Sequence, residues 1–432
     1  MLAPLRSRDF RLLWIGMTVS LVGDGIFLVA LAWQVYEISN APTALSVVGI
    51  AMSVPHIALL LAGGLVSDRF DRRRVMIAAD AVRGCAVAAV GTLSLTGSLE
   101  LWHLMALAAV YGAGTAFFGP AFDAIVPDLV PVEQLAQANS LDQFVRPAAW
   151  RLAGPAIGGW VIASWSVGDA FFLDAATFGA SIVAVALMRS RGVEADRSHS
   201  DSMIRDIREG FRFVRSRVWL WGTLLAATFA YLLFMGPQEV LLPFIVKNEM
   251  GGNAGDLGLV LAMGGVGAIL GAIVIGQRGA PPRYITFMYV TWTCSTLAVA
   301  GYGLARVPWQ AMIACFLFNA LETAGTIVWA TTKHRLVPRR LLGRVSSLDW
   351  FISTGLLPVS FALTGPVAAL IGSRTTLIAA GLLGAAVTLA FLFLPGMRAI
   401  EDDAPVPSRR PRNEPLPVPS ESHLVEPSPR LS

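Results

Sequence analysis

The stretch of sequence that decides the fold runs from Gly64 to Arg74 and reads GLVSDRFDRRR. Six of its last seven residues are charged, yet apolar runs at about 43–67 and 75–96 flank them. Each run is long enough to cross a bilayer as a helix, and only helices and closed barrels can cross one. A charged turn between two such runs indicates a loop between two membrane-spanning helices.

The same alternation of apolar runs and polar turns continues along the whole chain. Of the 432 residues, 55% are apolar and only 14% are charged, whereas an ordinary soluble protein has about 25% charged residues. This excludes a soluble enzyme, a secreted disulfide scaffold and a disordered chain, and it predicts an all-α membrane protein. Twelve runs can span a membrane, at about 12–35, 43–67, 75–96, 101–122, 142–164, 169–188, 219–246, 255–277, 283–305, 309–332, 347–371 and 375–395.

The basic residues indicate how the chain is oriented. If both termini are cytoplasmic, 27 of the 33 Lys and Arg residues lie on the cytoplasmic side. Three lie on the opposite side, Lys247, Arg306 and Arg374, and three lie within spans, Arg83, Arg146 and Arg151. Because basic residues are enriched in cytoplasmic loops, we expect both termini to be cytoplasmic, in a multi-pass protein of the bacterial inner membrane. The first apolar run is too long for a signal peptide and is expected to remain as the first span.

An internal repeat divides the chain into two similar halves. The segment that begins Leu129-Val130-Pro131 recurs 207 residues later as Leu336-Val337-Pro338, and each copy joins the fourth span of a half to the fifth. We therefore expect two pseudo-symmetric six-helix bundles. The expected parts are an N-terminal bundle (1–188), a cytoplasmic linker with an amphipathic helix (189–218), a C-terminal bundle (219–398) and a disordered Pro-rich cytoplasmic tail (399–432).

The Gly64–Arg74 stretch resembles the loop signature of the major facilitator superfamily, although Asp71 stands where the family usually has glycine. The resemblance implies a loop that gates the cytoplasmic side, where an acid meets a helix end and arginines pair with acids on adjacent helices. A plain positive-inside anchor is the alternative. The expected gating residues are Gly64, Asp68, Arg69, Arg72 and Arg73, with Asp123 of the fourth span as their partner.

A second motif lies in the fifth span and consists of Gly154, Pro155, Gly158 and Gly159. It looks like the helix-bend motif of proton-coupled drug antiporters in this superfamily, with Trp150 where those proteins have another glycine. Glycine-rich helix packing alone is the alternative interpretation. The short motifs together resemble the branch that contains enterobactin-exporter-like and macrolide-efflux proteins, over about residues 5–398.

The fourth span departs from the antiporter pattern. Gly112 and Gly114 fit it, but Ala108 and Tyr111 occupy the positions of the arginine and glutamine. The proton-relay role of that arginine cannot be transferred to this chain. Arg146 or Arg151 of the fifth span is the alternative carrier of the charge.

Acids inside the spans are the candidates for proton coupling. An ionised Asp at the centre of a membrane helix costs roughly 2.5–3.5 kcal/mol, so each needs a partner, a cavity or a proton. The superfamily arranges spans 1, 7 and 10 around a central cavity, which implies that Asp24, Glu239 and Glu322 face it. Asp80 with Arg83, and Asp142 with Arg146, have the spacings of intrahelical pairs.

These features predict a proton-coupled secondary transporter that exports small lipophilic or amphipathic compounds such as drugs and antibiotics. A dedicated exporter of one metabolite, such as a siderophore or a self-made antibiotic, is the main alternative, and uptake comes third. A polytopic membrane enzyme is disfavoured because the five histidines are dispersed. We expect no cofactor, metal or nucleic acid, a monomer, and small molecules, protons and membrane lipids as partners.

Overall fold

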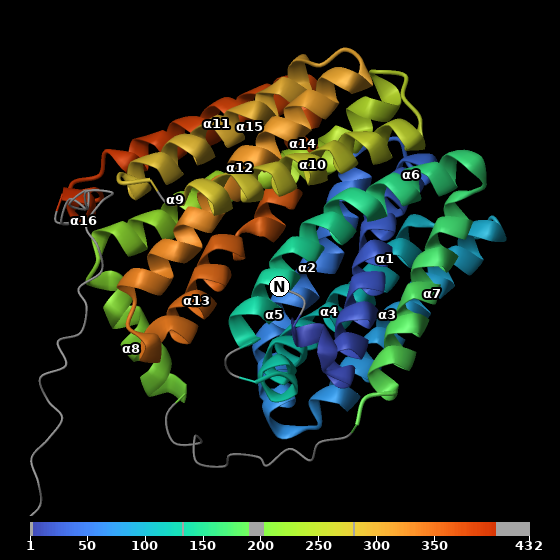
Figure 1. The fold of residues 1–432 in the computed structure, drawn as a ribbon. Coiled ribbons are helices and arrows are strands. Elements are labelled where there is room, and N and C mark those ends of the chain that lie inside the picture. The colour runs from blue at the N-terminus through green and yellow to red at the C-terminus, as the bar shows by residue number, and fades with distance from the viewer. Residues whose placement is uncertain (1–2, 132–133, 190–202, 280, 403–432) are drawn as a thin grey trace, which may run out of the picture.

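The computed structural model describes residues 3–131, 134–189, 203–279 and 281–402. It is built of helices, which Figure 1 shows in two groups. The first group comprises α1 (Arg8–Ile38), α2 (Pro42–Arg69), α3 (Arg72–Leu95), α4 (Leu101–Leu129), α5 (Leu135–Arg146), a π-helical turn η3 (Pro147–Ala153), α6 (Gly154–Ser164) and α7 (Val167–Ala186). The second comprises α8 (Met203–Arg215), α9 (Val218–Asn248), α10 (Ala254–Arg278), α11 (Tyr284–Leu304), α12 (Pro308–Leu336), α13 (Arg339–Thr354), α14 (Leu357–Ile371), α15 (Ser373–Leu392) and the short α16 (Ala399–Asp402).

The helices account for the expected spans, with two qualifications. Ten helical stretches of the described chain are long and apolar enough to cross a membrane. The other two expected spans, at about 142–164 and 283–305, are helical but lie outside these ten. The first is divided into α5, η3 and α6 by the π-helical turn, and α11 carries the polar run TWTCST at 291–296.

Local sequence signals set the ends of the membrane-spanning helices. Asn253 caps α10 by a reciprocal capping box with Asp256, and Ser166 accepts the N–H of Asp169 at the start of α7. Such side chains satisfy N–H groups that a helix leaves unpaired at its start. Gly372 separates α14 from α15 with φ of +85°, a conformation that favours glycine.

The first group of helices, α1–α7, is called the N-half here, and α8–α16 the C-half. The two ends of the bundle differ in how the halves meet. One buried apolar core contains residues of both halves, for example Val29 and Val48 with Leu241 and Val260. Two further apolar cores lie within the N-half and within the C-half alone. The shared core lies toward the face opposite the start of α1 and the short α16, and we call it the distal face; the face that holds the start of α1 and α16 is called the terminal face.

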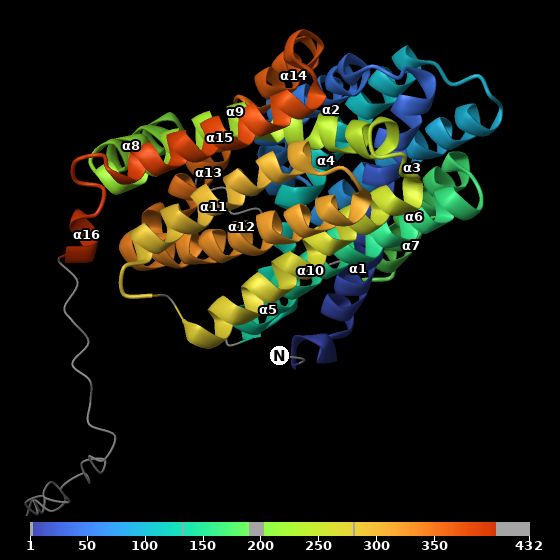
Figure 2. The same cartoon turned by 90° about the horizontal axis from the view of Figure 1, so that it is seen from above.

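The interrupted helices show the same asymmetry. Figures 1 and 2 show the two halves joined at one end and splayed toward the other. The distal segments α6 and α14 pack against α10 and α2 of the opposite half, while α5 and α13 make their main contacts within their own halves. The structure is therefore closed at the distal face and open at the terminal face.

Glycines permit the close contact at the distal face. A Cβ atom at Gly159 would lie 2.8 Å from the Cα of Gly258 in α10, which is closer than two carbon atoms on neighbouring helices can approach. Small residues of this kind let helix backbones in a membrane touch. The contact of α6 with α10 therefore depends on the absence of a side chain.

The expected linker and tail fall partly outside the described residues, which exclude 190–202 and 403–432. The expected amphipathic helix is α8, which packs on α13 through Gly210 and an ion pair of 2.5 Å between Glu209 and Arg344. Of its described apolar side chains, Val214 is buried but Phe211 is exposed. The helix therefore packs against α13 and α9 through only part of its apolar side chains.

Replacing Gly159 by Val should separate the halves at the distal face, because the new side chain would meet the backbone of α10, which cannot yield locally. The measurement is maleimide labelling of a cysteine placed at Val48, which is fully buried in the core that both halves share, in detergent-solubilised protein. We expect labelling to increase severalfold. Gly179→Val is the control, since a Cβ there meets nothing within 4 Å. Equal labelling in the two variants would contradict this account of the closure.

Candidate functional site

A cluster of buried charge lies in the N-half where α1, α3 and α4 meet. Arg83 of α3 pairs with Asp80 one turn earlier and lies 3.7 Å from the carboxylate of Asp24 in α1. The hydroxyl of Tyr111 in α4 donates to Asp24 at 2.6 Å. Arg83 and Asp80 are 3% and 0% exposed, whereas Asp24 is 17% exposed. Asp24 is therefore the acid of this cluster that solvent reaches.

Helix α7 and aromatic rings complete this N-half cluster. Ser181 donates to Asp80 at 2.7 Å, and the guanidinium of Arg83 lies 4.7 Å from the ring of Phe118 and 4.6 Å from that of Phe178. Buried Asp174 also acts electrostatically on the groups around Asp24. The cluster contains three carboxyl groups and one guanidinium, so it holds its full negative charge only at a high cost.

A second cluster joins the two halves at mid-helix. Arg151 of η3 donates to the side chain of Asn319 in α12 at 2.5 Å and lies 3.9 Å from the carboxylate of Glu322 on the same helix. Glu322 also accepts from Thr326 at 3.0 Å. Both charged side chains are partly exposed, 36% for Arg151 and 24% for Glu322. This contact is an ion pair between the halves that solvent reaches.

The π-helical turn explains how Arg151 comes to this position. The N–H of Gly154 bonds the carbonyl of Ala149, five residues back, and Pro155 has no N–H to offer the carbonyl of Arg151. Gly265 of α10 packs directly on this freed backbone. The Gly-Pro motif therefore deforms the helix at the residue that carries the charge, and π-turns of this kind are frequent at functional sites.

The other predicted acids occupy different surroundings. Glu239 of α9 is exposed, and the positive charge of Arg151 on the N-half acts on it electrostatically. Asp142 and Arg146 pair at 2.7 Å on α5, with Arg146 stacked 5.5 Å from the ring of Phe122. The structure thus brings Arg151 to Glu322, whereas the Asp142–Arg146 pair lies within the N-half.

The loop between α2 and α3 contacts only the N-half among its described side chains. Asp71 caps α3 by accepting the N–H of Arg73 at 2.9 Å, which gives a physical reason for an acid where the family usually has glycine. Arg73 donates to the last carbonyls of α7. Arg72 pairs with Asp128 at 2.6 Å. The sequence had led us to expect Asp123 as the partner instead. The reason is position, because Asp128 and the carbonyl of Ala124 lie where α4 ends beside the loop.

The remaining predicted residues are placed as follows. The side chain of Asp68 lies outside the described residues, Arg69 is exposed and Gly64 has open space beside it. In the helix-bend motif, Gly154 and Gly158 pack on α1, Pro155 is buried, and Gly159 packs on α10. The motif is therefore a contact surface on two neighbouring helices as well as a deformation of its own helix.

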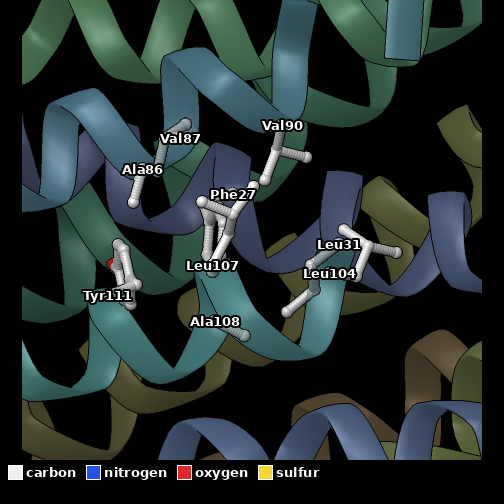
Figure 3. A pocket seen from close by; sticks show the side chains of 9 residues that line it. All are labelled: Phe27, Leu31, Ala86, Val87, Val90, Leu104, Leu107, Ala108 and Tyr111. Atoms are coloured by element: carbon white, nitrogen blue, oxygen red, sulfur yellow. The ribbon is translucent and has the colours of Figure 1, made fainter. Parts of the chain in front are cut away.

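One hollow adjoins the N-half cluster, and another lies away from both clusters. One lies within the N-half between α1, α3 and α4, and Figure 3 shows its lining side chains, among them Phe27, Val87 and Tyr111. It is apolar and has no room for a water molecule, so it is a packing gap. The other has a volume of about 570 Å³ and opens at the distal face. In the described part of the chain, no three His, Cys, Asp or Glu side chains gather as metal ligands would.

Comparison with known proteins identifies the family. A family model described as transmembrane secretion effector matches residues 1–422. The chain belongs to the transmembrane secretion effector family. The resemblance to the major facilitator superfamily, and to its macrolide-efflux branch, is confirmed by this match and by relatives of known name.

Two relatives match this family member over nearly its full length. It is similar to the multidrug efflux pump Tap of Mycolicibacterium fortuitum, with 29% identity over 88% of this chain and 94% of the relative. It is also similar to macrolide efflux protein A of Streptococcus pyogenes, with 23% identity over 91% of this chain and 97% of the relative.

Solved structures confirm the fold of this secretion effector. The nucleoside transporter NupG aligns with a TM-score of 0.68 at 8% identity, over 89% of this chain and 99% of that protein. A bacterial homologue of the iron transporter ferroportin, in an inward-facing state, aligns with a TM-score of 0.65 at 17% identity, over 89% and 98% of the two chains.

Sequence reasoning missed several partners in these clusters. It assigned no basic neighbour to Asp24 or Glu322, because it considered only residues of the same helix. Arg83 and Arg151 supply those charges from other helices. Tyr111 was noted only as a departure from the antiporter motif, and a hydroxyl in that place is the signal that points to Asp24. Asn319 had no signal beyond being polar within a span.

Replacing Arg83 by Met should lower the free energy of unfolding by about 3–5 kcal/mol, because the fully buried carboxylate of Asp80 and the partly exposed one of Asp24 lose their counter-charge. Arg146→Met is the comparison, since Arg146 is 42% exposed and exposed pairs contribute at most about 1 kcal/mol. The measurement is denaturant unfolding of the purified protein in detergent. Equal destabilisation by the two variants would remove the structural role of the Arg83 cluster.

Proposed function

We propose that this secretion effector is a secondary active transporter that exports small lipophilic or amphipathic organic compounds in exchange for protons. One observation carries the proposal: the N-half and the C-half meet at one face, separate toward the other, and share a solvent-accessible ion pair at mid-helix. Alternation between two such arrangements moves a molecule across a membrane. The nearly full-length similarity to one protein named as an efflux pump and another named as an efflux protein supports export as the direction.

The basic residues support the orientation of this transporter. With the terminal face in the cytoplasm, 27 of the 33 basic residues lie on the cytoplasmic side. The conformation described above is then open to the cytoplasm and closed to the outside. An exporter in this state is ready to accept its substrate from the cell interior or from the inner leaflet.

Glu322 is our choice for the coupling residue, because its charge lies on the boundary that must open. A proton on Glu322 removes its attraction for Arg151 of the other half, so protonation weakens a contact between the halves. A cationic substrate near Glu322 or Glu239 has the same effect, since it competes with Arg151 for these acids. Proton and substrate therefore act on the same contact, which is the requirement for exchange.

Asp24 has a different role in this proposal. Its partners Arg83 and Tyr111 belong to the same half, so its protonation leaves the boundary between the halves unchanged. Its exposure of 17% still gives protons access to a cluster with more carboxyl groups than guanidiniums. We assign it to proton transfer or substrate binding on the N-half side.

Glu322→Gln should abolish uphill export that a pH gradient drives in proteoliposomes, while it spares downhill exchange. The variant keeps the shape of the side chain but cannot carry the proton. Asp24→Asn should reduce the rate without uncoupling transport. Glu100→Gln, at an acid in the α3–α4 loop, is the matched control and should transport at the unchanged rate.

Uphill export at the unchanged rate by the Glu322→Gln protein would move coupling to Asp24 or Glu239. Unchanged uphill export by both the Glu322→Gln and the Asp24→Asn proteins would exclude proton coupling through Glu322 and Asp24. Absence of substrate-dependent exchange in the unmodified protein would reject the transport proposal itself.

The proposed topology has a direct test. A single cysteine placed at position 425 should remain unlabelled when an impermeant maleimide is added to intact cells, and should be labelled in inside-out vesicles. A cysteine at Asn253 in the distal loop should show the opposite pattern. Labelling of position 425 in intact cells would reverse the orientation.

A further inference from the structure

At the distal face, one lysine of the C-half binds the end of a helix of the N-half. The ammonium of Lys247, near the end of α9, donates to the carbonyl of Tyr36 at 2.7 Å and lies 5.0 Å from the centre of the Trp33 ring. The carboxylate of Glu37 attracts this ammonium electrostatically. Lys247 is one of only three basic residues that the expected topology places on this side. Its contact with Tyr36 and Trp33 joins the two halves at this face.

The N-half groups that hold this ammonium form a cation-binding arrangement. Tyr36 lies in the last turn of α1, where carbonyls lack partners within the helix and the helix dipole favours positive charge. The indole face of Trp33 attracts a cation through its quadrupole. The carboxylate of Glu37 accepts the Trp33 N–H at 3.0 Å, which fixes both side chains in place.

The same two side chains line the distal cavity of about 570 Å³. The cavity is widely open at the surface, and its volume lies within the range of small-molecule sites. Its described lining also includes the exposed indole of Trp165 and the amide of Asn253, and Glu37 is its one charged residue. A cavity with two indoles and a single carboxylate is complementary to an aromatic or alkyl cation.

We propose that the distal cavity is a second binding site, which takes organic cations such as alkylammonium compounds on Trp33 and Glu37, and that Lys247 is the built-in competitor for it. When the halves are closed at this face, Lys247 occupies the cation-binding groups. When they separate, Lys247 withdraws with the C-half and leaves them to an exported cation. The role in exit rests on the proposed export function, but binding to the site does not require transport.

The hydroxyl of Tyr36 donates to the carbonyl of Val240 in α9 at 2.6 Å, which is a further bond between the halves at this face. It involves no charge, so an organic cation does not compete with it. The proposal therefore concerns the ammonium position of Lys247 alone.

The test is equilibrium dialysis of radiolabelled methyltriphenylphosphonium with the purified full-length protein in detergent. Lys247→Met, and Lys247→Gln as a second variant, should tighten binding roughly tenfold, the order of one desolvated cation–π contact. Adding Glu37→Gln or Trp33→Leu to Lys247→Met should remove the gain. The neutral analogue triphenylphosphine oxide should show no gain.

Arg374→Met is the matched control. Arg374 is a cation of the same face, but its partners Glu249, Gly303 and Ala305 all belong to the C-half. Its loss should leave binding of the phosphonium unchanged.

Three results would overturn the proposal. Unchanged or weaker binding in both Lys247 variants excludes competition. A gain that survives Glu37→Gln but disappears with Glu322→Gln places the cation at mid-helix. An equal gain for the neutral analogue reduces the site to apolar space. Transport in proteoliposomes is measured separately. If the protein exports substrate but the variants do not show these changes in binding, only the second site is refuted. If the variants show the changes in binding but the protein does not export, only the transport function is refuted.

Discussion

A charge within an apolar span must find an opposite charge or a hydrogen-bond partner on a neighbouring helix, and both clusters of this protein follow from that constraint. In the N-half, Arg83 of α3 joins α1 through Asp24 and also pairs with Asp80 on its own helix. Between the halves, Arg151 is held by Asn319 and Glu322. In the first arrangement Arg83 and Asp80 are buried among aromatic rings and only Asp24 is partly exposed, so the cluster stabilises one bundle. The second is open to solvent, and the two halves share it.

The distribution of charge also explains why the halves meet at one face only. The distal segments α6 and α14 present Gly159 and Gly365 across the boundary, and glycines permit backbone contact without desolvating a charge. The terminal segments α5 and α13 carry Asp142 and Asp349, which pair with Arg146 and Lys333 of their own halves. Packing these segments against each other would bury or break those ion pairs. The open arrangement at the terminal face avoids this loss of free energy.

The repeat in the sequence makes these two segments equivalent. Asp142 and Asp349 occupy matching positions in the two copies, 207 residues apart, and each accepts from a cation near it. The helix-bend motif is not equivalent in the same way, because the π-helical turn with its arginine occurs in the fifth span alone among the described spans. The asymmetry of Arg151 within a symmetric plan is what makes the fifth span a candidate for coupling the halves.

The sequence by itself determined the membrane class, the helices, the two-half plan and the pairs within single helices, because apolar length and residue spacing are local properties of the chain. It also marked the acids at the centres of spans, since a carboxyl there is costly wherever the helix lies. Only the tertiary structure decided that Asp24 meets Arg83 and Tyr111, that Glu322 meets Arg151, and that Arg72 meets Asp128 in place of Asp123. Those partners come from other helices, and the rotation of one helix against another depends on packing along its whole length, which no short stretch of sequence encodes.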